Sequence, residues 1–416
     1  MKSKKKIVFV INYFYPDFAS TGQLMTELCM SLQQEFNITV IAAQPGYAGE
    51  DIKSTKKFEV EQMEKMKIIR IKLPKVDKTS KLSRIKYITS YFIYAQVVLL
   101  KERNVDLIYT ISQPPIIGGL IGTIGKWFKR SKHVYNIQDF NPEQAAAVSY
   151  TNKQIVFKVA KKIDMLNCSY ADKVIVVGND MCKTLHARYA NKRLPSHAVI
   201  NNWTNEEEIV PLNKTNSKIE QFLKGHNLEN KFIVMYSGNI GLFYDLENII
   251  KVTENFKDQE EIAFVFIGEG AVKKDMLEFV KRKGISNVYF LPYQSKEFIK
   301  YSLNAADVHL VVNQKGIKGV SVPSKIYGVM AAGKPILGVL EQGSEAQMLI
   351  EKSNNGLVIE PQDYEGITKA INQFYQMEKG QLKSMGLNGR AYLDKHLKRK
   401  ISINKYREVL NDVLEG

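Results

Sequence analysis

Three short glycine-containing turns, each following an apolar run, are the stretches of this chain best suited to chemistry. They comprise Ser20, Thr21 and Gly22 near the N-terminus, then Gly238, Asn239 and Gly241, and then Gly268, Glu269 and Gly270. Glycine lets a backbone approach a phosphate closely, and the N-terminus of a following helix offers free N–H groups and the positive end of its dipole. Glycine after a strand is also ordinary turn chemistry, and none of the three turns is the six-residue dinucleotide fingerprint. Their repetition in both halves of the chain predicts a site for a phosphate-bearing ligand.

A second stretch, VPSKIYGVMAAG, predicts a helix that begins at Pro323, continues through Ser324 and carries Lys325 in its first turn. Proline is tolerated there because its missing N–H would have had no intrahelical partner. The ammonium of Lys325 can then lie beside a phosphate that the helix N-terminus attracts. The alternative is a capped helix with a solvent-exposed lysine.

Short runs rich in Val and Ile alternate with helix-length segments along the whole chain. The strand candidates are KIVFVIN, ITVIAA, KIIRIKL, VDLIYTI, KHVYNIQD and DKVIVVG, followed by FIVMYSGNIG, AFVFIGEG, NVYFLPY, DVHLVV, KPILGVL and GLVIE. This β-α-β alternation predicts an α/β fold with doubly wound parallel sheets. The polar stretch at residues 200–218 interrupts the pattern, so we expect two Rossmann-like domains, residues 1–205 and 206–395, with a helical segment at 396–416.

The positive charge of the chain is concentrated in one half. The formal net charge is +16, and residues 1–200 hold 31 Lys and Arg against 16 Asp and Glu, which gives +15. A one-sided basic surface attracts an anionic partner such as a phospholipid face, a phosphorylated lipid or a nucleic acid, although a lysine-rich solvated surface is an equal alternative. No basic motif with interleaved aromatic residues indicates RNA binding.

Cysteine and histidine give no sign of a metal site. Cys29, Cys168 and Cys182 show neither paired metal spacing nor an even disulfide count, so we interpret them as small buried side chains in a reducing cytoplasm. The six histidines show no ligand spacing, and no Asp-x-Asp occurs. His133 and His309 lie within apolar strands, where we expect packed core side chains. We therefore expect no metal.

The segment KLSRIKYITSYFIYAQVVLLKER, residues 81–103, is rich in aromatic residues and flanked by Lys and Arg. It predicts either a core helix with exposed ends or a helix that buries one face in a lipid headgroup region. The basic first half of the chain favours the membrane alternative. No apolar stretch reaches the roughly 20 residues that span a bilayer.

Several motifs in both halves of the chain resemble those of a known protein family. YSGNIG, FVFIGEG, NVYFLPYQSKEFIKYSLNAADVHLVV and VPSKIYGVMAAGKPIL resemble the nucleotide-sugar-binding domain of retaining glycosyltransferases of family 4, which have the two-domain GT-B fold. NYFYPDFASTGQLMTELCMSL and QPPIIGG resemble a branch of that family that makes bacterial capsule and O-antigen repeats and includes N-acetyl-L-fucosamine transferases.

The resemblance implies transfer of a sugar from a nucleoside-diphosphate donor to an acceptor hydroxyl with retention of configuration. It implies that the helix with Lys325 faces the diphosphate and that Ser321 and Val322 line the approach. It also implies that the glycine turn at 238–241 passes close to the diphosphate, and that the turn at 268–270 borders the base. Such a lysine stabilises the charge that develops on the leaving group. The resemblance also implies that the final helix crosses back to the first domain, and that the donor is a substrate, so no cofactor is expected.

Two features depart from the family pattern. Its pair of glutamates, with seven residues between them, would fall at Val320 and Gly328, so both carboxylates are missing, and Glu345 is our candidate to hold the donor ribose instead. Its basic pair after the first glycine turn is replaced by Asn239 and Tyr244. Diphosphate binding should therefore depend more strongly on Lys325.

In the first half, Asp139 follows a strand, near the place where the family often has a histidine or an aspartate. A carboxylate there can orient or deprotonate the acceptor hydroxyl, whereas the alternative is a cap before Pro142. Glu143 is a second acceptor-side candidate, and Ser20, Thr21 and Gly22 would border the same cleft.

The resemblance therefore predicts a glycosyltransferase in capsule or surface polysaccharide synthesis. Its partners would be a nucleoside-diphosphate sugar, with UDP and an N-acetylated deoxyhexosamine as the family-level expectation, and a saccharide acceptor linked to polyprenyl diphosphate. The expected location is the cytoplasm, at the inner face of the cell membrane, with an anionic lipid surface and no nucleic acid as partner. A nucleotide-sugar epimerase on the same fold and a non-catalytic basic membrane-binding protein are the alternatives.

Overall fold

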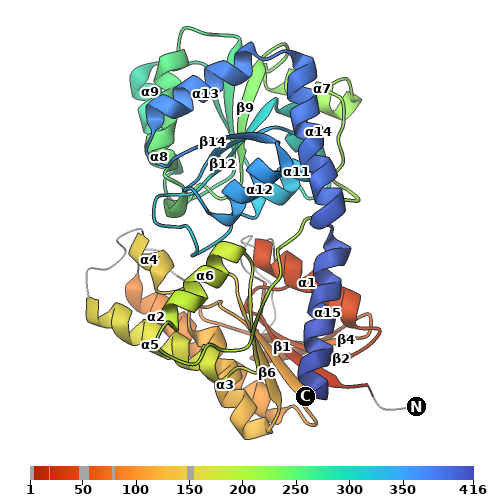
Figure 1. Ribbon diagram of the computed structural model, residues 1–416. Coiled ribbons are helices and arrows are strands. Elements are labelled where there is room, and N and C mark those ends of the chain that lie inside the picture. Colours follow the sequence, from red (N-terminus) through yellow and green to blue (C-terminus); the bar gives the residue numbers. More distant parts are fainter. Residues whose placement is uncertain (1–3, 18, 46–55, 77–79, 148–153) are drawn as a thin grey trace. The chain divides into compact units, whose positions relative to one another are not determined.

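The computed structural model describes residues 4–17, 19–45, 56–76, 80–147 and 154–416. It divides the chain into two compact units (Figure 1). The first unit comprises Met1–Ala146, Thr151–Asn201 and Ser402–Gly416, and the second comprises Ala147–Tyr150 and Asn202–Ile401. The boundaries after Asn201 and after Ile401 lie a few residues from the domain limits of 205 and 395 that the sequence suggests.

The first unit is built on an eight-stranded sheet with the order β3-β4-β2-β1-β5-β6-β7-β8. Its strands are β1 (Lys6–Val10), β2 (Asn37–Ala43), β3 (Phe58–Met63), β4 (Met66–Ile71), β5 (Leu107–Ile111), β6 (Lys132–Ile137), β7 (Lys173–Val176) and β8 (His197–Val199). Its helices are α1 (Ser20–Leu32), α2 (Lys81–Lys101), α3 (Ile117–Lys129), α4 (Glu143–Ala147), α5 (Gln154–Tyr170), α6 (Asn179–Arg188) and most of α15 (Arg399–Glu415). Every strand pairs in parallel except β3, which is antiparallel to β4.

The second unit is built on a six-stranded, wholly parallel sheet with the order β11-β10-β9-β12-β13-β14. Its strands are β9 (Phe232–Ser237), β10 (Ile262–Ile267), β11 (Val288–Leu291), β12 (Val308–Val312), β13 (Ile336–Val339) and β14 (Gly356–Ile359). Its helices are α7 (Ser217–Gly225), η1 (Leu242–Tyr244), α8 (Leu246–Ile249), η2 (Ile250–Phe256), α9 (Lys273–Lys283), α10 (Ile299–Ala305), α11 (Lys325–Ala331), α12 (Glu345–Ser353), α13 (Tyr364–Gln376) and α14 (Lys379–His396).

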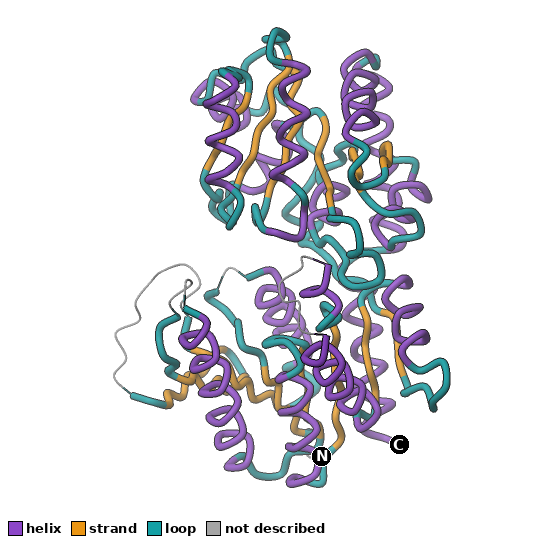
Figure 2. The backbone as a smooth tube through the Cα atoms, turned by 90° about the vertical axis from the view of Figure 1, so that its left-hand side faces the viewer, coloured by secondary structure: helices purple, strands orange, loops and turns teal. Residues whose placement is uncertain are grey.

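Helices cover both faces of each sheet (Figure 2), so the central strands are buried on both sides and are mostly apolar. All six residues of β10 and all five of β5 and β12 are buried. His133 and His309 lie in β6 and β12 and are buried, as the sequence predicts. The α/β prediction with two doubly wound parallel sheets is confirmed.

The last helix belongs to the first unit over most of its length. Tyr406 of α15 is fully buried, and Asn136 of β6 donates from Nδ2 to the hydroxyls of Tyr406 (2.9 Å) and Tyr109 (2.6 Å). Arg407 of the same helix donates to Glu35 at 2.7 Å. Figure 1 shows this helix, in dark blue, beside the strands of the first unit.

Within the part of the chain that the structure describes, no helix combines the length and the apolar character needed to cross a bilayer.

Candidate functional site

The strand order of the second sheet reverses between β9 and β12. The chain runs outward from β9 to β10 and β11, then returns to lie on the other side of β9 and continues to β13 and β14. At such a reversal the loops after the two central strands diverge and leave a crevice at their carboxyl ends, where ligands of open α/β sheets bind. The loop at Gly238–Gly241 follows β9, and the segment that leads into Lys325 follows β12.

Lys325 lies at this reversal. Its Nζ is 4.8 Å from the ring centroid of Tyr236 and 3.9 Å from that of Tyr244. Its methylene chain passes directly over Gly238, because a Cβ added at that glycine would lie 2.5 Å from Lys325 Cε. The structure thus brings Lys325 together with the first glycine turn of the second unit, two features that are 87 residues apart in sequence.

The surroundings of Lys325 disfavour its charged form. Loss of hydration lowers the pKa of its ammonium from the ordinary value of 10.5 to about 7. Among the described residues no carboxylate forms an ion pair with it. An ammonium that lies among aromatic rings without a carboxylate can gain a strong partner when an anion arrives.

The helix that carries Lys325 begins later than the sequence predicts. The helix α11 begins at Lys325, with Ser324 as its N-cap, so the expectation of a helix from Pro323 is wrong by two residues. Ile326 N–H bonds to Pro323 O at 3.2 Å and Tyr327 N–H to Ser324 O at 3.3 Å, which are the i to i+3 bonds of a tight entry turn. Ser321, in an isolated bridge, and the buried Val322 precede this turn.

The two glycine turns of the second unit pack against each other. Gly238 and Gly268 both have φ near +140°, which favours glycine, and a Cβ at Gly268 would lie 1.9 Å from the carbonyl oxygen of Gly238. A Cβ at Gly270 would lie 2.1 Å from the carbonyl oxygen of Ile240. Ile240 N–H also bonds to Glu269 O at 2.9 Å. These glycines therefore have a packing role that turn chemistry alone did not predict.

Two further polar groups of these turns have partners within the unit. The carbonyl of Asn239 accepts a bond from the hydroxyl of Tyr236 at 2.5 Å, and the exposed Glu269 carboxylate pairs with Lys273 at 2.6 Å. Gly241 is close to the side chain of its own neighbour Asn239. Tyr236 was not predicted as a site residue, although its position directly before Ser237 and Gly238 was a usable signal.

Glu345 is the first residue of α12 and is only 3% exposed. It is therefore not an exposed loop glutamate. Glu341, four residues earlier, was not predicted and organises the loop before Ser321, since its Oε2 accepts the N–H groups of Gly316 and Lys318, each at 2.9 Å. Both carboxylates follow β13, the strand next to β12.

The first sheet reverses between β1 and β5 in the same way. Ser20, Thr21 and Gly22, predicted to precede a helix, are instead the first residues of α1, which follows β1. Gly22 is buried, and a Cβ there would lie 2.9 Å from the carbonyl oxygen of Tyr13. The glycine thus lets the helix start lie close to the strand-end loop.

Asp139 lies beyond the carboxyl end of β6 and is partly exposed. Its backbone N–H donates to Ser112 Oγ at 3.2 Å, and that of Gln138 donates to the same oxygen at 3.0 Å. Ser112 follows β5, so its hydroxyl holds the Asp139 turn next to the reversal. Asn12, at the end of β1, accepts a bond from Tyr87 of α2 at 3.3 Å, a contact that the sequence did not indicate.

Glu143 is engaged in an ion-pair network rather than free for an acceptor. Arg188 donates to Glu143 Oε1 at 3.0 Å and to Asp164 at 2.6 Å, and Lys161 lies 3.1 Å from Glu143. Burial acts to raise the pKa of Glu143, but the two cations outweigh it and hold that pKa below its ordinary value. The network joins α4, α5 and α6.

Comparison with known proteins identifies the class. Residues 218–392 match the family described as "Glycosyl transferases group 1". The chain is 29% identical over 291 residues to the probable glycosyltransferase WbjE of Pseudomonas aeruginosa, covering 68% of this chain and 69% of that one. It is also 29% identical over 186 residues, 44% of each chain, to the putative colanic acid biosynthesis glycosyl transferase WcaI of Escherichia coli K12.

Solved structures share the fold over nearly the full length. Sucrose-phosphate synthase from Thermosynechococcus elongatus superposes with a TM-score of 0.78 at 14% identity, covering 99% of this chain and 100% of that one. Anabaena HepE in complex with UDP and glucose gives 0.72 at 14% identity, covering 98% and 99%. The relatives are glycosyltransferases, residues 218–392 of the second unit match a group 1 glycosyl transferase domain, and the chain shares the fold of the solved structures. This class favours the enzyme prediction over the epimerase and non-catalytic alternatives.

Proposed function

We propose that the protein transfers a sugar from a uridine-diphosphate donor, with retention of configuration, to a lipid-linked saccharide in surface polysaccharide synthesis. The observation that carries the donor assignment is Lys325, an ammonium without a described carboxylate partner that lies over Gly238 and between two tyrosine rings. HepE, which shares the fold, is described in complex with UDP, and WcaI is named for colanic acid biosynthesis.

In this proposal the diphosphate binds against the Gly238–Gly241 turn with Lys325 as its counter-ion. As the bond between the anomeric carbon and the diphosphate oxygen breaks, negative charge grows on the leaving group, and a fixed ammonium stabilises that state more than the ground state. Glu345 is the proposed partner of the donor ribose. Asp139, in the first unit, is proposed to orient the acceptor hydroxyl or to accept its proton. No metal or cofactor takes part in the proposed reaction.

Isothermal titration calorimetry with UDP, GDP and UMP tests the donor site. We expect UDP to bind more tightly than UMP, and Lys325→Ala to weaken UDP binding at least tenfold, because one charge-assisted bond to phosphate contributes about 1.5–3 kcal/mol. Lys369→Ala is the matched control, since Lys369 is an exposed lysine of the same unit that pairs with Glu365. An unchanged dissociation constant in Lys325→Ala would contradict the assignment.

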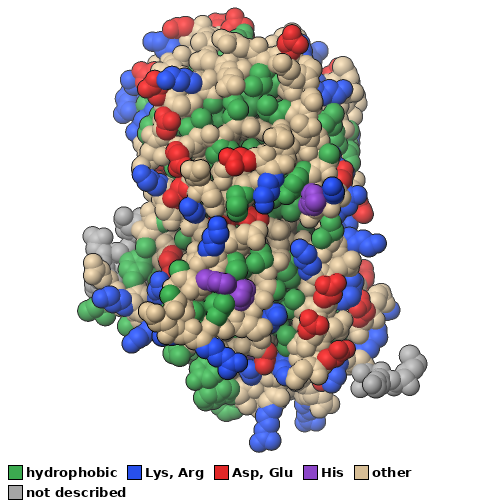
Figure 3. Space-filling view, viewed as in Figure 1, with side chains coloured by type: hydrophobic (Ala, Val, Ile, Leu, Met, Phe, Trp, Pro, Cys, Tyr) green, Lys and Arg blue, Asp and Glu red, His purple; other side chains and the backbone are tan. Residues whose placement is uncertain are grey.

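The lipid-linked acceptor is supported by an exposed apolar surface on the first unit. Three helices that lie side by side, α2, α3 and α5, expose large apolar side chains, and we name this surface the apolar helix face. Its members are Leu82, Ile85, Ile93, Val97, Leu100, Trp127, Phe128, Ile155, Val156, Val159, Leu166 and Tyr170. Hydrophobic side chains also reach the surface among Lys and Arg on the face of this unit in Figure 3.

Three observations favour a lipid surface as the partner of this face. Trp127 and Phe128 at the end of α3 are 68% and 70% exposed, and aromatic residues of this kind anchor proteins at membrane interfaces. Exposed lysines such as Lys86 and Lys158 lie on the same helices and can meet anionic headgroups. Helix α2 also carries Tyr87, which bonds to Asn12 at the carboxyl end of β1, so it connects this face to the edge where we place the acceptor.

Co-sedimentation with vesicles of anionic and of zwitterionic phospholipid tests the membrane proposal. We expect binding to the anionic vesicles, and at least a tenfold loss in the double variant Trp127→Ser/Phe128→Ser, because burying each ring contributes about 1.5–3 kcal/mol. The control is Leu277→Ser/Leu387→Ser, which removes two half-exposed apolar side chains from the second unit. Equal binding by the wild type and the Trp127/Phe128 variant would contradict a role for this face.

A further inference from the structure

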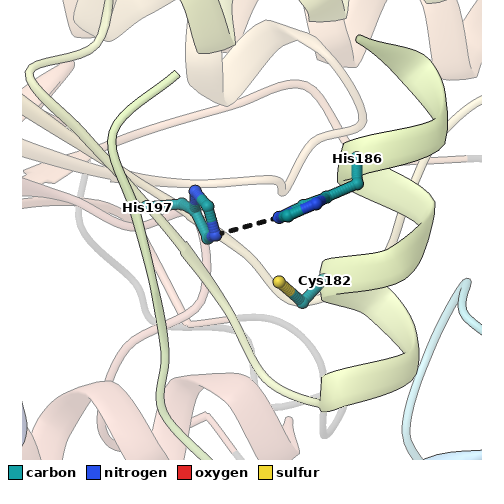
Figure 4. A group of neighbouring side chains, drawn as sticks. All are labelled: Cys182, His186 and His197. Atoms are coloured by element: carbon teal, nitrogen blue, oxygen red, sulfur yellow. Dashed lines mark hydrogen bonds between the residues drawn. The ribbon is translucent and has the colours of Figure 1, made fainter. Parts of the chain in front are cut away.

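One group of side chains outside the proposed site has the composition of a metal centre. Cys182 and His186 lie one turn apart on α6, and His197 is the first residue of the edge strand β8. One ligand atom from each of the three lies within 4.8 Å of the others (Figure 4). Cys182 is partly exposed, so the sequence prediction that it is a buried side chain is wrong, whereas Cys29 and Cys168 are buried.

The distance between the two imidazoles fits a shared ion. His186 Nε2 and His197 Nε2 are hydrogen-bonded at 3.3 Å, the dashed line in Figure 4, and their rings are nearly perpendicular, at 86°. A bound ion would take the place of this hydrogen bond. Zinc–nitrogen bonds of about 2.0–2.1 Å at the tetrahedral angle place two nitrogen ligands about 3.3–3.4 Å apart. The cysteine and histidine pair at positions i and i+4 projects from one face of α6 toward the strand, as Figure 4 shows.

The second nitrogen of His197 has the partner that a metal-binding imidazole requires. Nδ1 lies 3.1 Å from the carbonyl oxygen of Pro195 and donates its proton to it. Nε2 therefore carries the lone pair and faces the other two ligands. A backbone carbonyl in this position fixes the tautomer and the ring orientation of metal-binding histidines.

We propose that Cys182, His186 and His197 bind one Zn²⁺ ion, with a water molecule in the fourth position. Sulfur and imidazole ligands select zinc over magnesium or calcium. His186 is exposed and Cys182 and His197 are partly exposed, which leaves room for the water. The ion would join α6 to β8, a strand of three residues whose neighbour in the sheet is β7.

The location separates this centre from the proposed transfer site. His197 pairs with Val174 near the start of β7, so the ligands lie toward the amino ends of the strands, whereas Ser112 and Asp139 lie at the carboxyl ends. The expected role is to hold the edge of the first sheet. The inference does not depend on the proposed function.

Titration of the untagged full-length protein with Co²⁺, in the presence of a phosphine reductant, tests the proposal. We expect one equivalent to bind and to produce the near-ultraviolet charge-transfer band of a cobalt–thiolate bond, which Zn²⁺ then abolishes by displacement. Cys182→Ser should lose the band, and His197→Gln should weaken Co²⁺ binding at least tenfold. His396→Gln, which removes an exposed histidine of the second unit, should leave both unchanged.

Thermal unfolding with and without Zn²⁺ provides a second readout. We expect Zn²⁺ to raise the unfolding midpoint of the wild type but not of His197→Gln, because an ion that binds only the folded state stabilises it. Absence of the charge-transfer band in the wild type, or its persistence in Cys182→Ser, would overturn the proposal. UDP binding by Lys325 is expected to be the same with and without Zn²⁺, so failure of one proposal leaves the other intact.

Discussion

The protonation state of a lysine depends on the surroundings of its ammonium. The ammonium of Lys325 lies near the rings of Tyr236 and Tyr244, and its methylene chain lies over Gly238. With a pKa near 7 it loses its proton within the physiological range, unlike an ordinary surface lysine. A diphosphate beside it would favour the charged form and raise this pKa. Donor binding should therefore be coupled to proton uptake.

This coupling predicts that UDP binds more weakly as the pH rises above 7. Below pH 7 the free protein already carries the protonated ammonium, whereas above it each binding event must also bind a proton, so the dissociation constant should rise by up to about tenfold per pH unit. Calorimetry at pH 6.5, 7.5 and 8.5 measures this slope. Lys325→Arg, which stays charged throughout, should remove it, and a flat profile in the wild type would contradict the assignment.

A buried ion pair stabilises the turn that follows Asp139. Arg188 is almost completely buried, stacks on Phe140 at 4.1 Å and binds Asp164, which is also buried and accepts a bond from Tyr135 at 2.8 Å. Burial raises the pKa of Asp164, and Arg188 opposes that rise. Removing the cation would leave a buried carboxylate without its counter-charge.

We predict that Arg188→Met lowers the free energy of unfolding of the first unit by about 3–5 kcal/mol. The folded-state pKa of Asp164 would rise further above its unfolded value, so the deficit should be largest at neutral pH and should shrink as the pH falls through the raised pKa. Urea denaturation followed by circular dichroism at pH 5 and pH 7 measures both effects.

The double variant Arg188→Met/Asp164→Asn serves as the control for the buried charge. It should recover part of the lost stability and lose this pH dependence, because position 164 no longer carries a carboxyl group and Glu143 keeps Lys161 as a partner. Equal deficits in the single and double variants would show that the loss comes from packing and not from the buried charge.

The sequence could not reveal these partners. Glu143 was a plausible acceptor residue as long as its neighbours were unknown, and its neighbour Arg188 lies 45 residues away. Cys182 and His186 have a metal-binding spacing that was overlooked, but His197 joins them only through the pairing of β8 with β7. The position of Lys325 at the carboxyl end of the sheet was predictable, because a lysine at the start of a helix that follows a buried strand has few places for its side chain. Its role in binding a donor stays a prediction.

At the scale of secondary-structure elements, the loops after β9 and β10 are hydrogen-bonded to each other. Gly238 N–H bonds to Ile267 O at 2.9 Å and Ile240 N–H to Glu269 O at the same distance, so the two strands continue to pair beyond their ends. The close approach of Gly268 to the Gly238 carbonyl leaves no space for a side chain.

We predict that Gly268→Ala lowers the free energy of unfolding of the second unit by at least about 2 kcal/mol, through the positive φ and the clash with Gly238 O. Gly225→Ala is the control, because a Cβ there has no neighbour within 4 Å, and it should change stability by less than about 1 kcal/mol. The fluorescence of Trp203, in a Trp127→Phe background, follows the unfolding of this unit alone. If Gly268→Ala left the free energy of unfolding unchanged, the result would show that the two loops separate easily.

The elements that the sequence did not predict have little apolar pattern. Strand β3 has the sequence FEVEQM, lies at the antiparallel edge and is largely exposed, and β8 has three residues. Both are edge strands, which need fewer buried side chains than the central strands that were predicted. The start of α11 was misplaced because proline is compatible with both a first helical turn and the entry turn that precedes it.

At the scale of the whole molecule, the two units differ in surface chemistry. Nearly all of the excess positive charge lies in residues 1–200, and the apolar helix face lies in the first unit as well. The charge asymmetry was visible in the sequence. The exposure of the three helices could not be predicted from the sequence, because an apolar helix face is compatible with a protein core and with a membrane surface. Only the packing of α2, α3 and α5 shows which apolar side chains reach the surface.

The return of the chain to the first unit at Ser402 has a consequence for proteolysis. A single cut between Asn201 and Asn202 would produce two fragments that separate on a denaturing gel, yet the larger fragment would still contribute Tyr406 to the interior of the smaller one. The nicked protein should therefore migrate as one species under native conditions. After such a cut, helix α15 of the larger fragment would hold the two fragments together by non-covalent packing alone.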